Sequence, residues 1–425
     1  MRTRWKYPFF SNNQVLTTHN FSNFGHLIKR FFSRFFKPAP LPTHYPREWV
    51  STPAALKRTV AAIKSSKKVY FDLEADSMHH YYAKICLMQI LANGRCYLVD
   101  PLENLDLRPL LVALSEKPII GHGIDYDLRM LFAEHNFKPL EIFDTMLAAQ
   151  LLGRSAFGLA ALVQEFFGIT LVKEGQKADW SRRPLTADLV EYAAQDTFFL
   201  PELHAALTLE LEGRGRLSWH KESCESLIRA TQRVKEVDPD MSWRITGSAR
   251  FTQRQLAILK AMWEVREQYG RDRDLPSYKI LPADILLRFA ESVPEEGSPA
   301  ETTRLPSRLH PDLREDLLEA FEDALASRED EWPLPLPPAK RPARAPHPEL
   351  LIDMRDMRDG IAKKLALDPS LLAPKAMMLT VALALTKPEA TPESVRAAAS
   401  WMKWQEGLLL AGWTKAAEKY QRKRG

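Results

Sequence analysis

Two carboxylates one residue apart interrupt a stretch that otherwise has the pattern of a buried β-strand. In VYFDLEADS, residues 69–77, Asp72 and Glu74 share one face of the expected strand, because successive strand side chains point to opposite faces. Like charges repel, and burial of an uncompensated charge is costly. A metal cation, a lysine or arginine partner, or a solvent-exposed strand end would each reduce that cost.

A second pair of acids follows a short apolar stretch. In IIGHGIDYDLRML, Asp125 and Asp127 lie where a buried strand is expected to end and a helix to begin, which is a usual place for functional groups in α/β sheets. Metal chemistry on phosphates needs oxygen ligands that converge from different elements, and either acid could supply one. Helix N-capping, which contributes about 1 kcal/mol, is the alternative role for each.

A third acid lies on a helix that is otherwise largely apolar. In LTADLVEYAAQDTFFL, Tyr192 and Asp196 are four residues apart and share one helix face, with Thr186 as the expected N-cap. An acid in such surroundings needs either a cation or a structural ion pair or hydrogen bond. Together, Asp-x-Glu on a strand, Asp at a strand-to-helix turn and Tyr-x-x-x-Asp on a later helix form one ordered pattern.

This pattern resembles the DEDD superfamily of 3′–5′ exonucleases, in the branch with a tyrosine in the third motif, and most closely its ribonuclease D family. The stretches FDTMLAAQLLG, ADWSRRPLT and EYAAQD also carry the resemblance, which covers residues 50–210. It implies four metal ligands, namely Asp72, Glu74, Asp127 and Asp196. Tyr192 is implied as the catalytic partner of Asp196. Asp125 competes with Asp127 for the second motif, which the family's spacing assigns to Asp127, and Asp144 fits a helix N-cap.

The resemblance also implies a reaction. Oxygen ligands suit two divalent cations, Mg²⁺ or Mn²⁺, and the absence of a Cys/His cluster in the sequence argues against structural zinc. In-line attack of water on the terminal phosphodiester would release nucleoside 5′-monophosphates without a covalent intermediate. We expect Tyr192 to orient this water, because a phenol with a pKa of about 10 is a poor base at neutral pH.

Basic and aromatic residues before the third motif are candidate RNA contacts. The loop QKADWSRRPLT offers Lys177, Trp180, Arg182 and Arg183. Arg183 could instead anchor the loop to the fold. Three nearby histidines lack metal-ligand spacing, and we expect His79 and His80 on a surface loop and His122 in the core or a loop.

The elements that must position these residues alternate between strands and helices. Strands are predicted at 69–75, 83–91 and 95–99, and helices at 107–115, 126–135, 145–152, 159–167 and 187–209. This is an α/β domain with a mixed sheet flanked by helices, and the resemblance implies a ribonuclease H-like exonuclease domain over residues 48–212.

From about residue 250 the sequence predicts helices alone. The resemblance identifies two small all-α modules as HRDC-like domains, the first at 245–327 and the second at 349–420. The Pro-rich stretch 328–348 is expected to be an extended linker. In the second module Trp401, Trp404 and Trp413 are expected in the core rather than as base-stacking platforms.

Composition limits the classes of function. The net charge of +5 is concentrated in residues 1–50, which hold eight basic residues and one acidic residue, whereas the remainder holds 51 basic and 53 acidic residues. Any polyanion site in the body must therefore be a local patch. The acid-poor extension 1–47 resembles a transit peptide or a membrane-surface helix. A disordered extension and an upstream start codon are together about as compatible with it, and it stays unassigned. No apolar run is long enough to span a bilayer.

The expected function is metal-dependent trimming of RNA 3′ ends, chiefly of tRNA precursors, by a monomer in the cytoplasm, or in an organelle if residues 1–47 are a transit peptide. Three cysteines without paired or metal-type spacing suit a reducing compartment. A DNA repair exonuclease is the second hypothesis, and a non-catalytic RNA-binding scaffold is the third. The scaffold hypothesis predicts loss of the carboxylates, and all of them are present.

Overall fold

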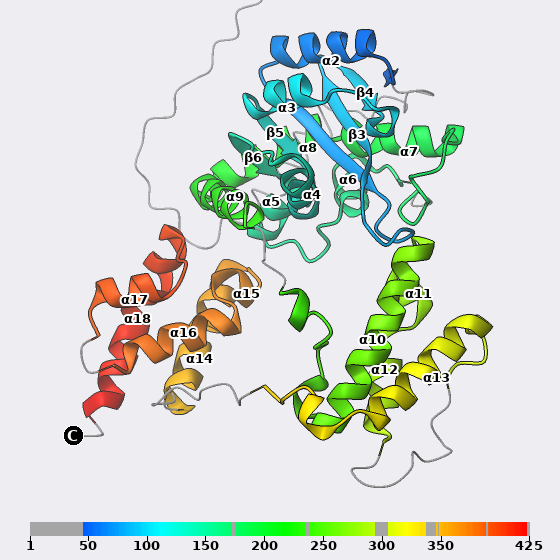
Figure 1. Ribbon diagram of the computed structural model, residues 1–425. Coiled ribbons are helices and arrows are strands. Elements are labelled where there is room, and N and C mark those ends of the chain that lie inside the picture. The colour runs from blue at the N-terminus through cyan, green and yellow to red at the C-terminus, as the bar shows by residue number, and fades with distance from the viewer. Residues whose placement is uncertain are drawn as a thin grey trace, which may run out of the picture.

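The computed structural model describes residues 46–171, 175–233, 238–293, 305–336, 346, 348–387 and 390–422. It has an α/β domain and two helical regions (Figure 1). The predicted extension 1–47 lies outside the described residues except at its end, and so do residues 337–345 and 347 of the predicted linker. Among the described helices, none is both long and apolar enough to cross a membrane.

A six-stranded mixed sheet forms the centre of the α/β domain. Its strands are β1 (Arg47–Val50), β2 (Val69–Ala75), β3 (Ile85–Ala92), β4 (Arg95–Val99), β5 (Pro118–Gly121) and β6 (Glu141–Asp144), in the spatial order β1-β4-β3-β2-β5-β6. Strand β3 pairs antiparallel with β2 and β4, whereas β2, β5 and β6 are parallel. Antiparallel pairing of β3 and β4 follows from the tight turn at Asn93 and Gly94, both of which have positive φ.

Helices cover both faces of the sheet. They are α2 (Pro53–Ser65), α3 (Arg108–Ser115), α4 (Asp125–His135), α5 (Thr145–Leu151), α6 (Leu159–Phe167), α7 (Ala187–Phe198), α8 (Leu200–Gly213) and α9 (Leu217–Thr231). Phe71 and Leu73 of β2 point into a core with α2, α3 and α4. The alternate residues of β2, Asp72 and Glu74, therefore face the other side, where α7 packs.

The sequence predicted most of these elements within two residues. The predicted helix over 187–209 is wrong as one element, because the structure has α7 and α8 with a break at Phe199. Pro201 lies in the first turn of α8, where its missing N–H costs nothing, but its ring cannot continue the preceding helix. The strands β1 and β6 and the helices α2 and α9 have no counterpart in the predicted elements.

The first helical region follows the α/β domain. Its helices are α10 (Gln253–Arg273), α11 (Ser277–Ile280), α12 (Ala283–Glu291) and α13 (Pro311–Ala326), and they enclose a core of their own. A capping box between Thr252 and Gln255 begins α10, and Asp274 ends it in the left-handed conformation with φ of 50°. Residues 294–304 of this region lie outside the described residues.

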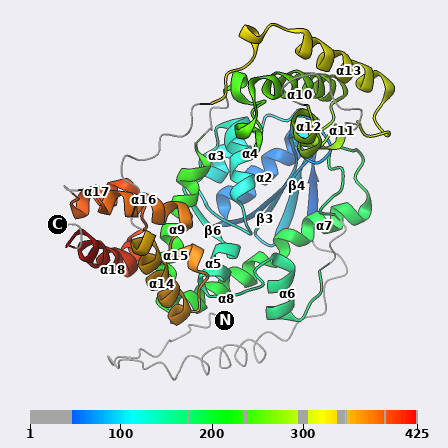
Figure 2. The ribbon, with the colours of Figure 1, turned by 90° about the horizontal axis from the view of Figure 1, so that it is seen from below.

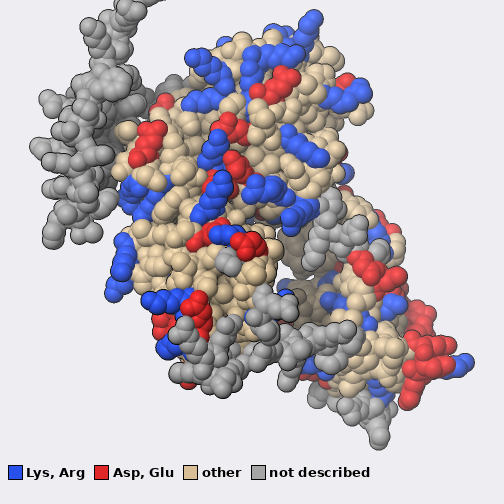
Figure 3. All heavy atoms as spheres, turned by 90° about the vertical axis from the view of Figure 1, so that its left-hand side faces the viewer, with Lys and Arg blue, Asp and Glu red and all other residues tan. Residues whose placement is uncertain are grey.

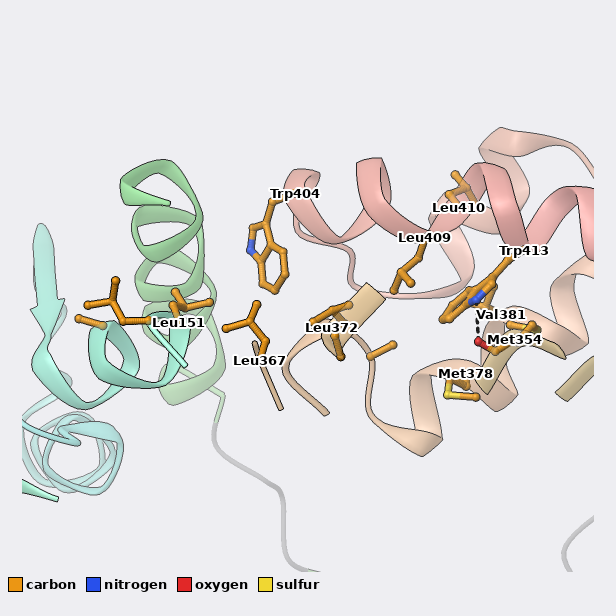
Figure 4. Packing of buried hydrophobic residues seen from close by; sticks show 14 of the residues in the cluster. Leu151, Met354, Leu367, Leu372, Met378, Val381, Trp404, Leu409, Leu410 and Trp413 are labelled. Atoms are coloured by element: carbon orange, nitrogen blue, oxygen red, sulfur yellow. Dashed lines mark hydrogen bonds between the residues drawn. The ribbon is translucent and has the colours of Figure 1, made fainter. Parts of the chain in front are cut away.

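The second helical region shares its core with the α/β domain. Its helices are α14 (Pro348–Leu365), α15 (Pro369–Leu372), α16 (Lys375–Leu385), α17 (Pro392–Ala398) and α18 (Lys403–Arg422). One apolar cluster joins Leu151 of α5 to Leu367 and Trp404 and continues to Trp413, whose indole donates to the Met354 carbonyl (Figure 4). Trp404 and Trp413 are buried and Trp401 is half-buried, so the prediction that they are core residues is confirmed.

Both helical regions therefore contact the α/β domain, on different sides of it (Figure 2). Arg216 fixes the second region, because its buried guanidinium donates to the carbonyls of Leu151 and Leu365. The Trp219 and Trp404 rings stack beside it with centroids 4.8 Å apart. The second region is thus packed against the sheet domain as part of one core.

Candidate active site

Three carboxylates from two elements converge on the α7 side of the sheet. Asp72 and Glu74 come from β2 and Asp196 from α7, and one ligand oxygen of each lies within 4.8 Å of the others. Tyr192 lies one helical turn before Asp196. All four residues line a pocket of about 660 Å³. The first motif (Asp72 and Glu74) and the third motif (Tyr192 and Asp196), which are the farthest apart in the sequence, therefore meet in the fold.

Electrostatics at this cluster favour protonated carboxyl groups when no cation is bound. Burial raises the pKa of Asp72 to about 7. Burial, followed by the charges of Asp72, Asp196 and Asp127, raises the pKa of Glu74 to about 10. The pKa of Asp196 also lies well above its usual range through burial and the Asp72 charge. The cluster thus lacks positive charge.

Tyr192 shares this environment. Burial and the neighbouring Asp196 and Glu74 charges raise the pKa of its hydroxyl above the usual range. A phenol that holds its proton so firmly cannot act as a base at neutral pH, but it can donate a hydrogen bond. This supports the expectation that Tyr192 orients a water molecule.

The two acids of the second motif differ in their surroundings. Asp125 is 49% exposed and forms an ion pair with Arg129, with Nε and Oδ2 3.0 Å apart. Asp127 is buried, and its pKa is raised well above the usual range by burial and by the charge of Asp72. The structure therefore favours Asp127 as the acid that belongs to the cluster, although it lies outside the group of three within 4.8 Å.

Asp144 has a structural role. Its carboxylate accepts hydrogen bonds from the backbone N–H groups of Met146 and Leu147 at the start of α5. It also accepts from Gly123 and Ile124, just before α4. The prediction that Asp144 is an N-cap is confirmed. The hydrogen bonds that its carboxylate accepts from Gly123 and Ile124 also fix the turn that leads to Asp127.

A loop between α6 and α7 forms one wall of the pocket. Gln176 and Lys177 line it, and Lys177 is exposed. Gly175 lies so close to the Tyr192 ring that a Cβ there would be 2.4 Å from it. Only glycine permits this approach, so the loop directly restrains the tyrosine. The sequence analysis missed Gly175, for which the only signal was an isolated glycine in a polar stretch.

Two of the four candidate RNA contacts are engaged in contacts within the protein. Trp180 is 1% exposed and packs beside Tyr192, with ring centroids 6.1 Å apart, so its expected RNA contact is wrong in this arrangement. Arg183 anchors the loop: it forms an ion pair with the buried Asp100 and donates to the Cys86 carbonyl at 2.7 Å. Lys177 and Arg182 remain as exposed candidates, with Arg182 paired to Asp179.

The loop between β2 and β3 connects the pocket to the first helical region. His80 Nδ1 lies 2.7 Å from Asp274 Oδ2, and its Nε2 lies 2.8 Å from Ser181 Oγ. The Tyr81 amide donates to Asp274, and the Tyr278 hydroxyl donates to the carbonyl of the pocket residue Met78. His79 and His80 are indeed loop residues, but the sequence analysis missed that they join three segments.

His122 is half-buried at the edge of the same pocket. Its Nδ1 lies 2.9 Å from Thr145 Oγ1, and burial lowers its pKa to about 4. A neutral imidazole does not neutralise the acidic cluster. His122 therefore lies in a loop after β5, as one of the two expected locations, and contributes to the pocket wall.

The donor set fits divalent cations. Among the residues that the structure describes, no lysine or arginine forms an ion pair with Asp72, Glu74 or Asp196. Three carboxylates with no protein cation are costly unless protons or metal ions neutralise them. Oxygen ligands without cysteine or imidazole suit Mg²⁺ or Mn²⁺ better than zinc.

Comparisons with known proteins point to one family. A family described as 3′-5′ exonuclease matches residues 47–212. The chain is 29% identical to ribonuclease D of Escherichia coli strain K12 over 68% of this chain and 78% of the relative. It is 30% identical to ribonuclease D of Jannaschia sp. over 60% of this chain and 68% of the relative. The crystal structure of Escherichia coli RNase D superposes with a TM-score of 0.65 at 25% identity and covers 88% of this chain and 99% of that chain.

Fold and sequence thus define the class of a 3′–5′ exonuclease whose catalytic domain spans residues 47–212. Within that class the chain belongs to the ribonuclease D family. It is a hydrolytic 3′–5′ exoribonuclease, as the resemblance had implied.

Proposed function

We propose that this exoribonuclease requires divalent cations and trims the 3′ ends of structured RNAs such as tRNA precursors. The observation that carries the proposal is the convergence of Asp72, Glu74 and Asp196 within 4.8 Å, with Tyr192 in the same pocket. Asp72, Glu74, Asp127 and Asp196 are the proposed ligands. Bound Mg²⁺ or Mn²⁺ would activate the attacking water and stabilise the leaving oxygen.

Side chains of the pocket perform the remaining steps. The Tyr192 hydroxyl donates to the attacking water and aims it at the terminal phosphorus. Lys177, which is exposed on the pocket wall, contacts a backbone phosphate of the bound RNA end in this proposal. Met78 and Leu159 give the pocket apolar surface on which a terminal base can rest. The products are nucleoside 5′-monophosphates and a chain shortened by one residue.

Structured substrates are proposed from similarity and from the helical regions. The superposed Escherichia coli enzyme is described as an exoribonuclease involved in structured RNA processing. We interpret the regions 245–327 and 349–420 as HRDC-like domains that contact the body of such an RNA. Residues 328–348 would form the linker between them.

The charge of the first helical region limits which of its faces can contact RNA. Helix α13 carries many acids on its surface, namely Asp312, Glu315, Asp316, Glu319, Glu322 and Asp323. Figure 3 shows acidic side chains gathered at the lower right, over this region, whereas Lys and Arg are spread across the α/β domain. A polyanion would be repelled from the α13 face, so the proposed RNA path lies along the α/β domain.

A product ladder tests the proposal. A 5′-labelled hairpin RNA with a single-stranded 3′ tail, and a DNA hairpin of equal sequence, are incubated with Mg²⁺, Mn²⁺ or a chelator. We expect a ladder that shortens from the 3′ end, depends on the cation and is faster on RNA. Digestion that persists in chelator would refute the metal requirement. A faster ladder on DNA would favour the repair hypothesis, and binding without cleavage would favour the scaffold hypothesis.

A further inference from the structure

A glutamine amide is buried without a partner behind the acidic cluster. Gln89 is 0% exposed, and its Nε2 and Oε1 atoms have no hydrogen-bond partner among the residues that the structure describes. Buried amides are nearly always hydrogen-bonded, and leaving both atoms unpaired destabilises the folded chain. An exception of this kind in the middle of a sheet needs a specific explanation.

The pairing of the strands places Gln89 beside a proposed metal ligand. In the antiparallel pair of β2 and β3, Gln89 lies directly opposite Asp72, so their side chains share one face of the sheet with Cβ atoms about 5 Å apart. Leu87 and Leu91, two residues before and after Gln89, pack against Ala193 and Ala194 of α7. Gln89 therefore points into the layer between the sheet and α7, which is the layer that contains the active site.

The surroundings of the Gln89 amide offer few other hydrogen-bond partners. The same apolar cluster holds Leu98 of β4, the residue opposite Gln89 on its other side. The hydroxyl of Thr197 on α7 is already used, because it lies 3.5 Å from Cys96 Sγ and donates to the Ala194 carbonyl. Among the residues that the structure describes, no side chain forms a hydrogen bond or an ion pair with the Asp72 carboxyl. The buried Gln89 amide and the half-buried Asp72 carboxyl thus share one face of the sheet, and neither has a side-chain hydrogen bond among the described residues.

We propose that Gln89 is a positioning residue of the active site: when the divalent cation is bound, its amide N–H donates to one Asp72 oxygen and so directs the other oxygen toward the cation. The inference rests on the proposed role of Asp72 as a metal ligand. A carboxylate that holds a cation is a pure acceptor, and an amide N–H donor to its other oxygen fixes its orientation. Gln89 acts through Asp72 and does not touch the substrate.

This role predicts opposite effects on folding and on metal binding. Gln89→Met keeps the length of the side chain and removes both unpaired atoms. We expect the unfolding midpoint of the metal-free variant to equal or exceed that of the wild type. We also expect the Mn²⁺ affinity to fall about tenfold or more, and kcat on an RNA oligomer to fall at least as much with KM nearly unchanged. A purely structural glutamine would not produce this combination.

The experiment uses the full chain and titrates Mn²⁺ by calorimetry in four proteins: wild type, Gln89→Met, Leu91→Met and Asp72→Asn. Leu91→Met is the matched control, because it alters the same strand face and the same apolar cluster, opposite Tyr70 rather than Asp72. Thermal unfolding in chelator is measured in parallel. We expect Leu91→Met to bind Mn²⁺ as the wild type does.

Three outcomes would overturn the assignment of Gln89. They are an unchanged Mn²⁺ affinity in Gln89→Met, an equal loss of affinity in Leu91→Met, and a fall of the metal-free midpoint of Gln89→Met by more than about 5 °C. A failure of the proposed function has a different signature: Asp72→Asn would bind Mn²⁺ as tightly as the wild type, or the wild type would not bind it.

Discussion

At the scale of single residues, isosteric substitution can distinguish the proposed metal ligands from neighbouring acids that bind no metal. Asp72→Asn keeps the shape of the side chain and removes a charge from a cluster without protein cations. We expect kcat to fall about a thousandfold, which corresponds to about 4 kcal/mol of barrier, while the fold is retained. Steady-state kinetics on a short RNA oligomer, with circular dichroism as a check of folding, would measure both. Near-normal kcat would refute the ligand assignment.

The second motif offers its own control. Asp125→Asn removes an equal charge two residues from Asp127, but from a side chain that is half exposed and paired with Arg129. Because an exposed ion pair of this kind contributes little, we expect activity within about twofold of the wild type, whereas Asp127→Asn should be severely impaired. The opposite ranking of the two variants would assign the second motif to Asp125.

The raised pKa values of the cluster give a pH dependence of defined sign. In the metal-free fold burial raises the pKa of Asp72 to about 7, and burial and neighbouring charges raise that of Glu74 to about 10. In the unfolded chain both titrate at about 4. The folded state therefore binds more protons between these values, and its free energy of unfolding falls as pH rises from about 4 through 7.

Thermal unfolding in chelator at about pH 5 and pH 8 would measure this effect. We expect the midpoint of the wild type to fall more steeply with pH than that of Asp72→Asn, which lacks the titrating group. Mn²⁺ must displace these protons, so its affinity should rise over the same range. Parallel pH profiles for the two proteins would show that the carboxyl does not titrate as proposed.

At the scale of elements, the end of α10 restrains the pocket. Asp274 accepts from His80 and from the Tyr81 amide, and this loop also supplies Met78 to the pocket. Asp274→Asn keeps a residue that tolerates the left-handed conformation but removes the charge. We expect kcat/KM on a trinucleotide to fall about tenfold, because a lost charge-assisted hydrogen bond is worth on the order of 1.5 kcal/mol.

A trinucleotide distinguishes positioning from RNA binding, since it is too short to extend along the helical region. Asp272→Asn is the matched control: Asp272 accepts a hydrogen bond only from Gln268, within α10, among the contacts described for it. This variant should cleave the trinucleotide normally. If Asp274→Asn affected long RNAs alone, the first region would act in binding and not on the pocket.

The same contacts show what could be predicted from sequence at this scale. Residue spacing located β2, α6 and α7, because these patterns are local, whereas only the family resemblance implied that Asp72, Glu74 and Asp196 act together. The break between α7 and α8 was missed even though Pro201 signals it, since the apolar period continues across it. The link between His80 and Asp274 spans 194 residues, and no local pattern encodes such a contact. Gln89 was missed because a lone polar residue in an apolar strand reveals no partner.

At the scale of the whole molecule, the second helical region is part of the same core as the α/β domain. Deleting residues 349–425 would expose Leu151, Leu162 and Leu203 and leave Arg216 without its Leu365 acceptor. Activity on every substrate should then fall through loss of stability, so deletion cannot isolate a role in RNA recognition.

Two glycines test this shared core without removing any element. Gly153 and Gly168 both have positive φ, so alanine at either costs roughly 1–2 kcal/mol in backbone strain. A Cβ on Gly168 would meet nothing within 4 Å, whereas one on Gly153 would lie 2.0 Å from the Ala366 carbonyl oxygen of the second region. Gly153→Ala should therefore lower the unfolding midpoint several degrees more than Gly168→Ala, with faster hydrogen exchange at residues 350–366. Equal midpoints would mean that the second region is only loosely attached and can follow the RNA independently of the catalytic domain.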